Sequence, residues 1–316
     1  MSFDAVDVGV DFLGRSLRAP LLITGMTGGT PEAFAVNRDL ATVAERCGLA
    51  FGLGSQRVMQ RDPSIQWTFA VRELAPSTVL LANIGLVQAT QQSTDAVGEL
   101  VAAVRADALC IHLNPAQEMV QAEGDRDFRG GLATIERLCR ELAVPVIVKE
   151  TGCGISRPVA VALREAGVRT IDVAGAGGTS WVQVEALRGD DRSRDLGALL
   201  STWGIPTAAS LACLDGLGLD LIASGGVRSG LDMAKALALG ARLCGAALPI
   251  YRAYCAGGIG AATALVDQLI EQLKAAMLLT GSGSLATLAQ QPVVLAPRLR
   301  GWIEACAAPR GASRRG

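Results

Sequence analysis

Eight short apolar runs recur along this 316-residue chain, and turn signals bound each of them. All are rich in Val, Ile, Leu and Ala; they span residues 20–26, 49–54, 79–85, 108–113, 145–150, 170–175, 220–226 and 241–247. Because the runs are continuously apolar rather than alternating, they are typical of parallel strands covered on both faces. Segments with helical periodicity lie between them, at residues 31–47, 94–105, 132–142, 158–166 and 230–239. Eight such units predict a closed (β/α)8 TIM barrel.

A doubly wound open sheet uses the same units and is the alternative fold. It is favoured by a glycine fingerprint after the first strand and an acidic residue at the end of the second. Here the first strand leads into Thr27-Gly28-Gly29 and the second ends in Ser55-Gln56-Arg57, so the barrel is the better prediction. No linker or low-complexity tract divides the chain, and we expect one domain over residues 1–316. Residues 182–204 form the longest predicted loop, either a cover for the active site or solvated surface.

Composition excludes several classes of partner. The formal net charge is −1, and the basic tail from Arg310 to Arg315 is too short to make a nucleic-acid-binding surface. The N-terminus lacks a signal sequence, and no apolar run reaches the roughly 18 residues that span a bilayer. The eight cysteines include no C-x-x-C pair, which favours reduced thiols. We therefore expect a soluble cytoplasmic protein that binds neither nucleic acid nor membrane.

The densest group of polar residues follows the fourth predicted strand, from His112 to Gly131. Catalytic groups of α/β proteins lie at the carboxyl ends of strands, so His112, Gln117 and Glu118 are candidates for anion binding, proton handling and metal binding. A carboxylate oxygen suits Mg²⁺ better than zinc. The alternative is a histidine that fills a barrel layer beside a solvated loop. The density of polar groups favours the functional interpretation.

The other strand ends carry groups suited to phosphate or to a polar heterocycle. Glycines after strands one, six and seven bring backbone N–H groups close to a ligand, and Gly230 opens a predicted helix beyond them. Lys149 emerges from a buried strand and needs an anionic partner, either a ligand or a carboxylate, that of Glu150 or another. Arg57 is a forked cation suited to a diphosphate, with a surface ion pair to Asp62 as the alternative.

These motifs together resemble those of the type 2, flavin-dependent isopentenyl diphosphate isomerase family. They run in the family's order: Met26-Thr-Gly-Gly29, Gly54-Ser-Gln-Arg57, Ala82-Asn-Ile-Gly85, His112-Leu-Asn-Pro-x-Gln-Glu118, Val148-Lys-Glu150, Asp172-Val-Ala-Gly-Ala-Gly-Gly-Thr-Ser-Trp181 and Ser224-Gly-Gly-Val-Arg228. The resemblance implies FMN, Mg²⁺ and an NADPH supply for flavin reduction. It makes Glu118 the Mg²⁺ ligand, Gln117 the residue near the transferred proton, and Arg57, His112 and Gln117 the substrate-binding residues. The implied FMN-binding residues are Met26, Thr27, Gly28, Ser55, Asn83, Lys149, Thr179, Gly225, Gly226, Arg228, Gly245 and Ala246.

The expected activity is interconversion of isopentenyl and dimethylallyl diphosphate, in a homo-oligomer. Alternatives are another FMN barrel, such as a 2-hydroxyacid oxidase or an isomerase of a different prenyl compound, and a flavoprotein without catalysis. Family members carry an Arg-Lys-x-x-His diphosphate clamp ahead of the first barrel strand, whereas the segment around Asp7 already matches the stretch after that clamp. Without a second histidine, we expect these 316 residues to bind the diphosphate weakly.

Overall fold

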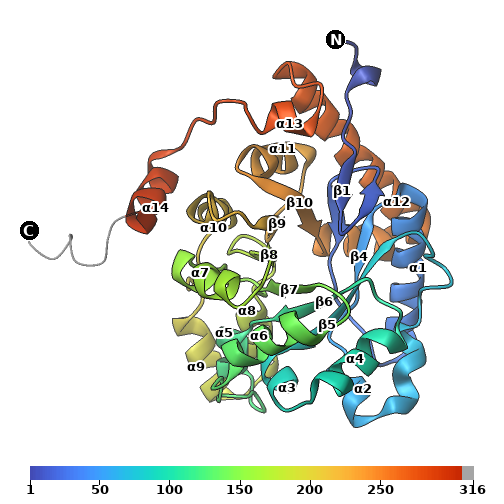
Figure 1. Cartoon of the computed structure of the whole chain (residues 1–316), viewed down its shortest axis with the longest axis vertical. Coiled ribbons are helices and arrows are strands. Elements are labelled where there is room, and N and C mark those ends of the chain that lie inside the picture. The colour runs from blue at the N-terminus through green and yellow to red at the C-terminus, as the bar shows by residue number, and fades with distance from the viewer. Residues whose placement is uncertain (308–316) are drawn as a thin grey trace, which may run out of the picture.

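A closed barrel of eight parallel strands lies at the centre of the computed structural model, which describes residues 1–307 (Figure 1). Each strand falls within one of the predicted apolar runs, and the TIM-barrel prediction is confirmed. The order around the barrel is β10-β3-β4-β5-β6-β7-β8-β9. The strands are β3 (Leu21–Ile23), β4 (Ala50–Gly52), β5 (Val79–Gly85), β6 (Ala108–His112), β7 (Val146–Lys149), β8 (Thr170–Asp172), β9 (Asp220–Ser224) and β10 (Ala241–Ala246).

Helices surround the barrel, and local sequence signals set their ends. In α1 (Pro31–Cys47), the Thr30 side chain accepts a hydrogen bond from the Ala33 amide at the start, and Gly48 ends the helix in the left-handed conformation. The other helices are α2 (Arg57–Arg61), α3 (Leu86–Thr90), α4 (Thr94–Ala103), α5 (Pro115–Val120), α6 (Gly131–Glu141), α7 (Arg157–Glu165), α8 (Trp181–Arg188), α9 (Asp191–Leu199), α10 (Thr207–Leu214), α11 (Gly230–Ala238), α12 (Leu248–Leu279), α13 (Leu285–Leu288) and α14 (Pro297–Ala307), with 3₁₀ turns η1 (Phe3–Ala5) and η2 (Pro63–Phe69).

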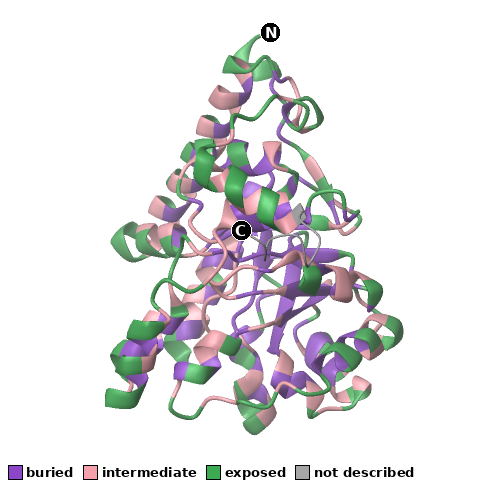
Figure 2. Cartoon of the chain, turned by 90° about the vertical axis from the view of Figure 1, so that its left-hand side faces the viewer, coloured by how far each residue is buried: buried purple, intermediate pink, exposed green. Residues whose placement is uncertain are grey.

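The interior of the barrel changes from apolar to polar along the strands. Near the amino ends it is filled by an apolar cluster that includes Leu81, Cys110, Ile147 and Ile222. A hairpin of β1 (Val10–Phe12) and β2 (Arg15–Leu17) adds Phe12 to this cluster. The strands are the most continuously buried part of the molecule (Figure 2). Polar side chains such as those of Asn83, His112, Lys149, Asp172 and Ser224 occupy the carboxyl ends, so the chemistry is confined to one end of the barrel.

The prediction of a long loop over residues 182–204 was wrong, because two helices occupy most of it. Ser180 and Asp190 cap α8 and α9 by accepting hydrogen bonds from the Gln183 and Ser193 amides. Val182 and Ala186 of α8 then pack against Val120 of α5. Because the segment is rich in polar residues, neither its capping residues nor the i, i+4 spacing of its apolar residues was recognised as a helix signal.

The long helix α12 was also not expected. Among the helices within residues 1–307, it alone is long and apolar enough to cross a membrane by length and composition. Its backbone is non-helical at Gly257 and Gly258, however, and the helix packs along α1 and α11. After these glycines, one face is buried through residues including Val266 and Leu273, whereas Asp267 is exposed. These features are those of an outer helix of the barrel.

One disulfide contradicts the expectation that the thiols are reduced. Cys213 of α10 and Cys306 of α14 are bonded, with their Cα atoms 5.7 Å apart and 93 residues between them in sequence. The packing of α14 against α10 brings them together, and no local motif marks a pair so distant in the chain. The basic tail Arg310 to Arg315 lies outside the described residues. The predicted domain boundary at residue 316 lies there too and stays a prediction.

Candidate functional site

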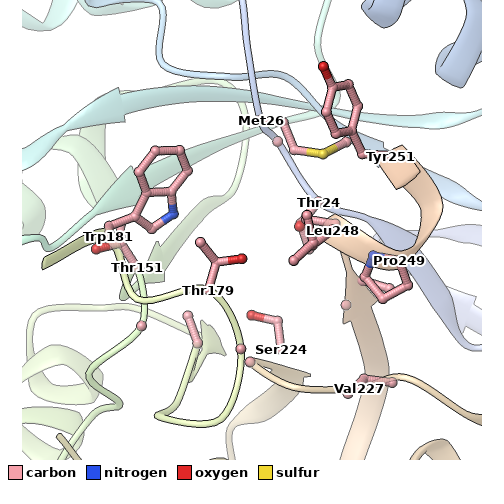
Figure 3. Close-up of a pocket in the computed structure, with 18 of the residues that line it drawn as sticks. Thr24, Met26, Thr151, Thr179, Trp181, Ser224, Val227, Leu248, Pro249 and Tyr251 are labelled. Atoms are coloured by element: carbon pink, nitrogen blue, oxygen red, sulfur yellow. The ribbon is translucent and has the colours of Figure 1, made fainter. Parts of the chain in front are cut away.

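A cavity of about 680 Å³ opens at the carboxyl ends of the barrel strands (Figure 3). It lies where the first strand, β3, meets the last three, β8 to β10, with Lys149 of β7 on one side. Nine of the twelve predicted FMN-binding residues line it: Met26, Thr27, Lys149, Thr179, Gly225, Gly226, Arg228, Gly245 and Ala246. Residues more than 200 positions apart in sequence thus meet in one space, as the barrel topology predicts.

Two glycine-rich loops form one wall of this cavity. Gly225 and Gly226 have φ angles of +100° and +91°, which favour glycine. A Cβ atom on Gly225 would lie 2.1 Å from the Gly175 carbonyl oxygen, and one on Gly226 would lie 2.6 Å from that of Gly177. The loops after β8 and β9 therefore pack backbone against backbone, which only glycine permits. This packing leaves a wall of main-chain groups for a ligand.

Arg228 joins the same two loops. Its guanidinium donates hydrogen bonds to the carbonyl oxygens of Gly177 (2.7 Å) and Gly226 (3.3 Å) while lining the cavity. It thereby holds a positive charge beside the glycine wall. Such a site, rich in backbone groups and next to a fixed cation, suits a phosphate.

Of the two helices that follow the last two barrel strands, α12 lines the cavity and α11 does not. The sequence suggested that the helix beginning at Gly230 assists phosphate binding. In the structure the Gly230 amide donates to Gln272 (2.8 Å), and Ser229 and Asp232 cap the same end in a capping box. The first turn of α12, from Leu248, lines the cavity instead.

Lys149 faces the cavity, and Glu150 turns away from it. The Lys149 ammonium donates to the Glu150 main-chain carbonyl at 2.7 Å. One carboxylate oxygen of Glu150 accepts hydrogen bonds from the amides of Thr151, Gly152 and Cys153, at 2.6–2.8 Å. Burial raises the pKa of Glu150, and these amides oppose that effect. The Glu150 side chain thus stabilises the loop that follows it. The Lys149 side chain is left facing the cavity.

His112 and Asn83 form a fixed pair beside the cavity. The Asn83 amide nitrogen donates to the Leu53 carbonyl (3.1 Å), which turns its oxygen toward His112 Nδ1, 2.8 Å away. His112 must therefore carry its proton on Nδ1, with Nε2 as an acceptor. Burial, followed by the charges of Lys149 and Arg57, lowers the pKa of His112 to about 3. The imidazole is neutral until an anion binds nearby.

The predicted substrate-binding residues lie at neighbouring strand ends and do not line the main cavity. Arg57 begins α2, and none of the ion pairs among residues 1–307 involves it. The alternative pairing with Asp62 is wrong, because that carboxylate accepts hydrogen bonds from Ser64. The Gln117 amide donates to the Glu185 carboxylate of α8 at 3.4 Å.

Glu118, the predicted metal ligand, is a buried carboxylate with neutral partners. One oxygen accepts from the Asn114 side chain (2.9 Å) and the other from the Asp125 amide (2.8 Å). Within residues 1–307 no group of three His, Cys, Asp or Glu side chains could hold a metal ion. A buried charge usually has a cationic partner. An ion at Glu118 would therefore depend on water and substrate oxygens for its remaining ligands.

The remaining predicted cofactor residues lie outside the main cavity. A Cβ atom on Gly28 would lie 2.0 Å from the buried Phe69 ring, so packing alone requires glycine there. Asn83 borders a small cavity beneath the main one, which shares Thr24, Gly25 and Lys149 with it. Ser55 lines neither cavity. The roles proposed for these three residues stay predictions.

Sequence reasoning missed several residues that line the cavity. Trp181 and Tyr251 lie on opposite sides of it, with Thr179 and Ser224 between them (Figure 3). Trp181 directly follows the Gly175 to Ser180 run and could have been found from that position. Tyr251 lies in the first turns of α12, where no local pattern distinguishes a cavity residue from an outer one.

Comparison with known proteins identifies the family. Residues 72–295 match the family model of the FMN-dependent dehydrogenases. The chain is 51% identical over 305 residues to an isopentenyl-diphosphate delta-isomerase of Synechococcus sp., covering 94% of this chain and 86% of the relative. It belongs to the type 2 isopentenyl-diphosphate isomerase family. A second isomerase, from Methanopyrus kandleri, is 42% identical over 314 residues, which are 98% of this chain and 86% of that one.

Solved structures confirm the fold of this isomerase family member at much lower identity. A lactate oxidase of Pediococcus acidilactici superposes with a TM-score of 0.66 at 16% identity, covering 91% of this chain and 79% of the oxidase. A mandelate oxidase with 3,3-difluoro-2-hydroxy-3-phenylpropionic acid gives 0.63 at 18% identity, covering 93% and 84%. These likenesses support the TIM barrel alone.

Proposed function

We propose that this protein interconverts isopentenyl diphosphate and dimethylallyl diphosphate with bound reduced FMN as the acid/base group. The observation that carries the proposal is the glycine-walled cavity with Lys149 and Arg228, in a chain 51% identical to an isomerase over 94% of its length. The reaction moves a double bond without net redox change. NADPH would be needed only to reduce the flavin.

The cavity fits FMN by its size and by its lining groups. Gly225, Gly226 and Arg228 would hold the phosphate, because main-chain groups and a fixed cation meet there. Lys149 would neutralise negative charge on the ring system. When bound and reduced, the flavin supplies a group that can both donate and accept a proton.

The substrate diphosphate would lie toward Arg57 and His112. Arg57 takes part in none of the ion pairs within residues 1–307, and His112 has an unprotonated Nε2 that can accept a hydrogen bond. A diphosphate close to His112 would favour the charged imidazole and so gain a second cation. Glu118 would hold Mg²⁺, which would neutralise the charge of the diphosphate, because Mg²⁺ commonly binds through one or two carboxylates, water and substrate phosphates.

Gln117 would orient the reacting part of the substrate. Its amide nitrogen donates to Glu185, which leaves its carbonyl oxygen free for a proton-bearing partner. Trp181 and Leu248 give the cavity an apolar portion. Such a surface excludes water from a developing tertiary carbocation.

We further propose that the protein is a cytoplasmic homo-oligomer. Leu199 and Trp203 support an oligomer, because these large apolar side chains lie four positions apart, are 75% and 65% exposed, and would be covered at an interface. Light scattering on purified protein measures the state directly. A monomer at micromolar concentration would contradict this part of the proposal.

The test is an anaerobic assay of FMN-loaded protein with isopentenyl diphosphate and Mg²⁺, with dimethylallyl diphosphate detected by proton NMR. Product formation is expected only after the flavin has been reduced, and removal of Mg²⁺ should abolish it. Protein that takes up no FMN contradicts the cofactor assignment. Protein that holds FMN but forms no product would instead be a flavoprotein with another role.

A further inference from the structure

We propose that Asp172 is a positioning residue that balances the charge of Lys149 and so limits how strongly the site stabilises a negatively charged flavin. This inference rests on the proposed binding of FMN at Lys149. It concerns a carboxylate that lies beneath the main cavity, away from the predicted diphosphate side.

The barrel register places the two side chains on the same face of neighbouring strands, near enough to interact but without a direct ion pair between them. Asp172 is the last residue of β8, and its Cα pairs with that of Lys149 in the neighbouring strand β7. Residues in register on adjacent parallel strands point to the same side of the sheet. Both side chains border the small cavity below the main one, so both point into the barrel. Asp172 is only 2% exposed, which leaves its charge without solvent screening.

Hydrogen bonds hold the Asp172 carboxylate in place. One oxygen accepts from the Ser224 hydroxyl at 2.6 Å and from the Ala174 amide at 3.2 Å. Burial raises the pKa of Asp172, and the Lys149 charge followed by the Ser224 hydrogen bond opposes that effect. Because Ser224 donates its proton to Asp172, its oxygen can act only as an acceptor toward the main cavity that it lines.

Two other ionisable groups near Lys149, Cys110 and His112, carry no negative charge. Burial raises the pKa of Cys110 to about 12, so its thiol is neutral. His112 is neutral for the reasons given above. The Glu150 carboxylate also interacts with the Lys149 charge, but three amides of its own loop hold it outside the small cavity. Asp172 is therefore the carboxylate that borders the small cavity together with Lys149.

A balanced charge suits an acid/base role for the flavin. A lone ammonium would stabilise the flavin anion and weaken its hold on a proton, whereas a group that must give and take a proton works best near the ambient pH. Opposite charges on neighbouring strands interact appreciably at an effective dielectric constant of about 20. Removing the Asp172 charge should thus change the flavin's chemistry without touching the substrate side.

The affinity of oxidised FMN for sulfite tests this inference. Sulfite adds reversibly to N5 of the flavin and gives an anionic adduct, so a positive charge nearby strengthens binding and a negative charge weakens it. Asp172→Asn should bind sulfite about tenfold more tightly, or more, than wild type, as followed by loss of the flavin's visible absorption. Lys149→Met should bind it about tenfold more weakly, and the double variant should return close to wild type. The flavin midpoint potential should shift in parallel, by about 30 mV per tenfold for two electrons.

Asp220→Asn is the matched control, since it makes the same charge change at the opposite, amino end of β9, where Asp220 is exposed. It should leave sulfite affinity unchanged. If Asp172→Asn does not retain FMN, the same test is made by comparing the sulfite affinity of Lys149→Met with that of the double variant. The double variant should bind sulfite more tightly. Wild-type sulfite affinity and potential in FMN-loaded Asp172→Asn overturn the inference and leave the proposed function intact. Failure of wild type to bind FMN overturns the proposed function instead.

Discussion

At the scale of single residues, His112 shows how neighbouring groups set the protonation state of a side chain. Its Nδ1 proton is held by Asn83, and burial with the charges of Lys149 and Arg57 lowers its pKa to about 3. A histidine in water has a pKa near 6.5. The same residue is therefore a neutral acceptor here, and a ligand anion is what would change its charge.

This shift predicts how stability depends on pH. Above pH 6.5 His112 is neutral in both folded and unfolded protein, so it adds no pH dependence. Below pH 6.5 the unfolded chain binds a proton that the folded protein refuses until near pH 3, so folding is progressively weakened, by up to about 1.4 kcal/mol per pH unit. His112→Gln should flatten the loss between pH 6 and 4. Urea unfolding across this range measures it, and identical slopes for both proteins would argue against a buried neutral His112.

Gln117 and Glu118 are adjacent but have different partners, which predicts separable phenotypes. Gln117→Ala removes the group that contacts Glu185 and should lower kcat with FMN affinity unchanged. Glu118→Gln removes a charge and should raise the Mg²⁺ concentration needed for half-maximal rate by tenfold or more, because hydrogen bonds and ionic contacts to charged groups contribute about 1.5–3 kcal/mol. Steady-state assays across Mg²⁺ concentrations distinguish them. An unchanged Mg²⁺ requirement in Glu118→Gln would reassign the metal site.

At the scale of elements, the contact between the loops after β8 and β9 predicts a strong effect of one added carbon. Gly226→Ala places a Cβ 2.6 Å from the Gly177 carbonyl oxygen at a φ of +91°. The loops must separate, so FMN affinity measured by fluorescence quenching should fall at least about tenfold. Gly260→Ala is the control, because nothing lies within 4 Å of the position that its added methyl group would take on α12. Equal FMN affinity in the two variants would show that the glycine wall is not part of the cofactor site.

The disulfide between α10 and α14 should lower the number of free thiols and stabilise the folded protein. Denatured, unreduced protein should show six free thiols, and reduction should raise the number to eight. Cys306→Ala should lower the free energy of unfolding by about 2–4 kcal/mol, since a native cross-link restricts the unfolded chain. Cys255→Ala, at an exposed free thiol, should have little effect. Eight free thiols before reduction would exclude the bond.

At the scale of the whole molecule, residues from the first and the last barrel strands line the same cavity. Its wall contains Met26, which follows the first barrel strand, and Gly245, from the last one. A ligand there binds the closed barrel and not the unfolded chain. FMN at a hundredfold excess over its Kd should therefore stabilise the protein by about 2.7 kcal/mol, seen as a rise in Tm by calorimetry. Riboflavin lacks the phosphate and should give a smaller rise; an equal rise would place the phosphate away from Arg228.

The sequence alone determined the architecture and the end of the barrel that carries the chemistry. Parallel strands buried on both faces must be continuously apolar, and helix ends need caps, so both leave local patterns that can be read without coordinates. For the same reason the polar residues after each strand, from Thr27 to Arg228, could be assigned to one end of the barrel.

Only the tertiary structure decided which of those residues share a space. Lys149, Arg228 and Gly245 meet in one cavity, whereas Gly28 packs on Phe69 and Glu118 lies apart. The Cys213–Cys306 bond, the α8–α9 pair and the neutral state of His112 also depend on contacts between distant segments. A pattern in sequence reports what each segment buries, but distances, charges and desolvation arise only when segments pack together.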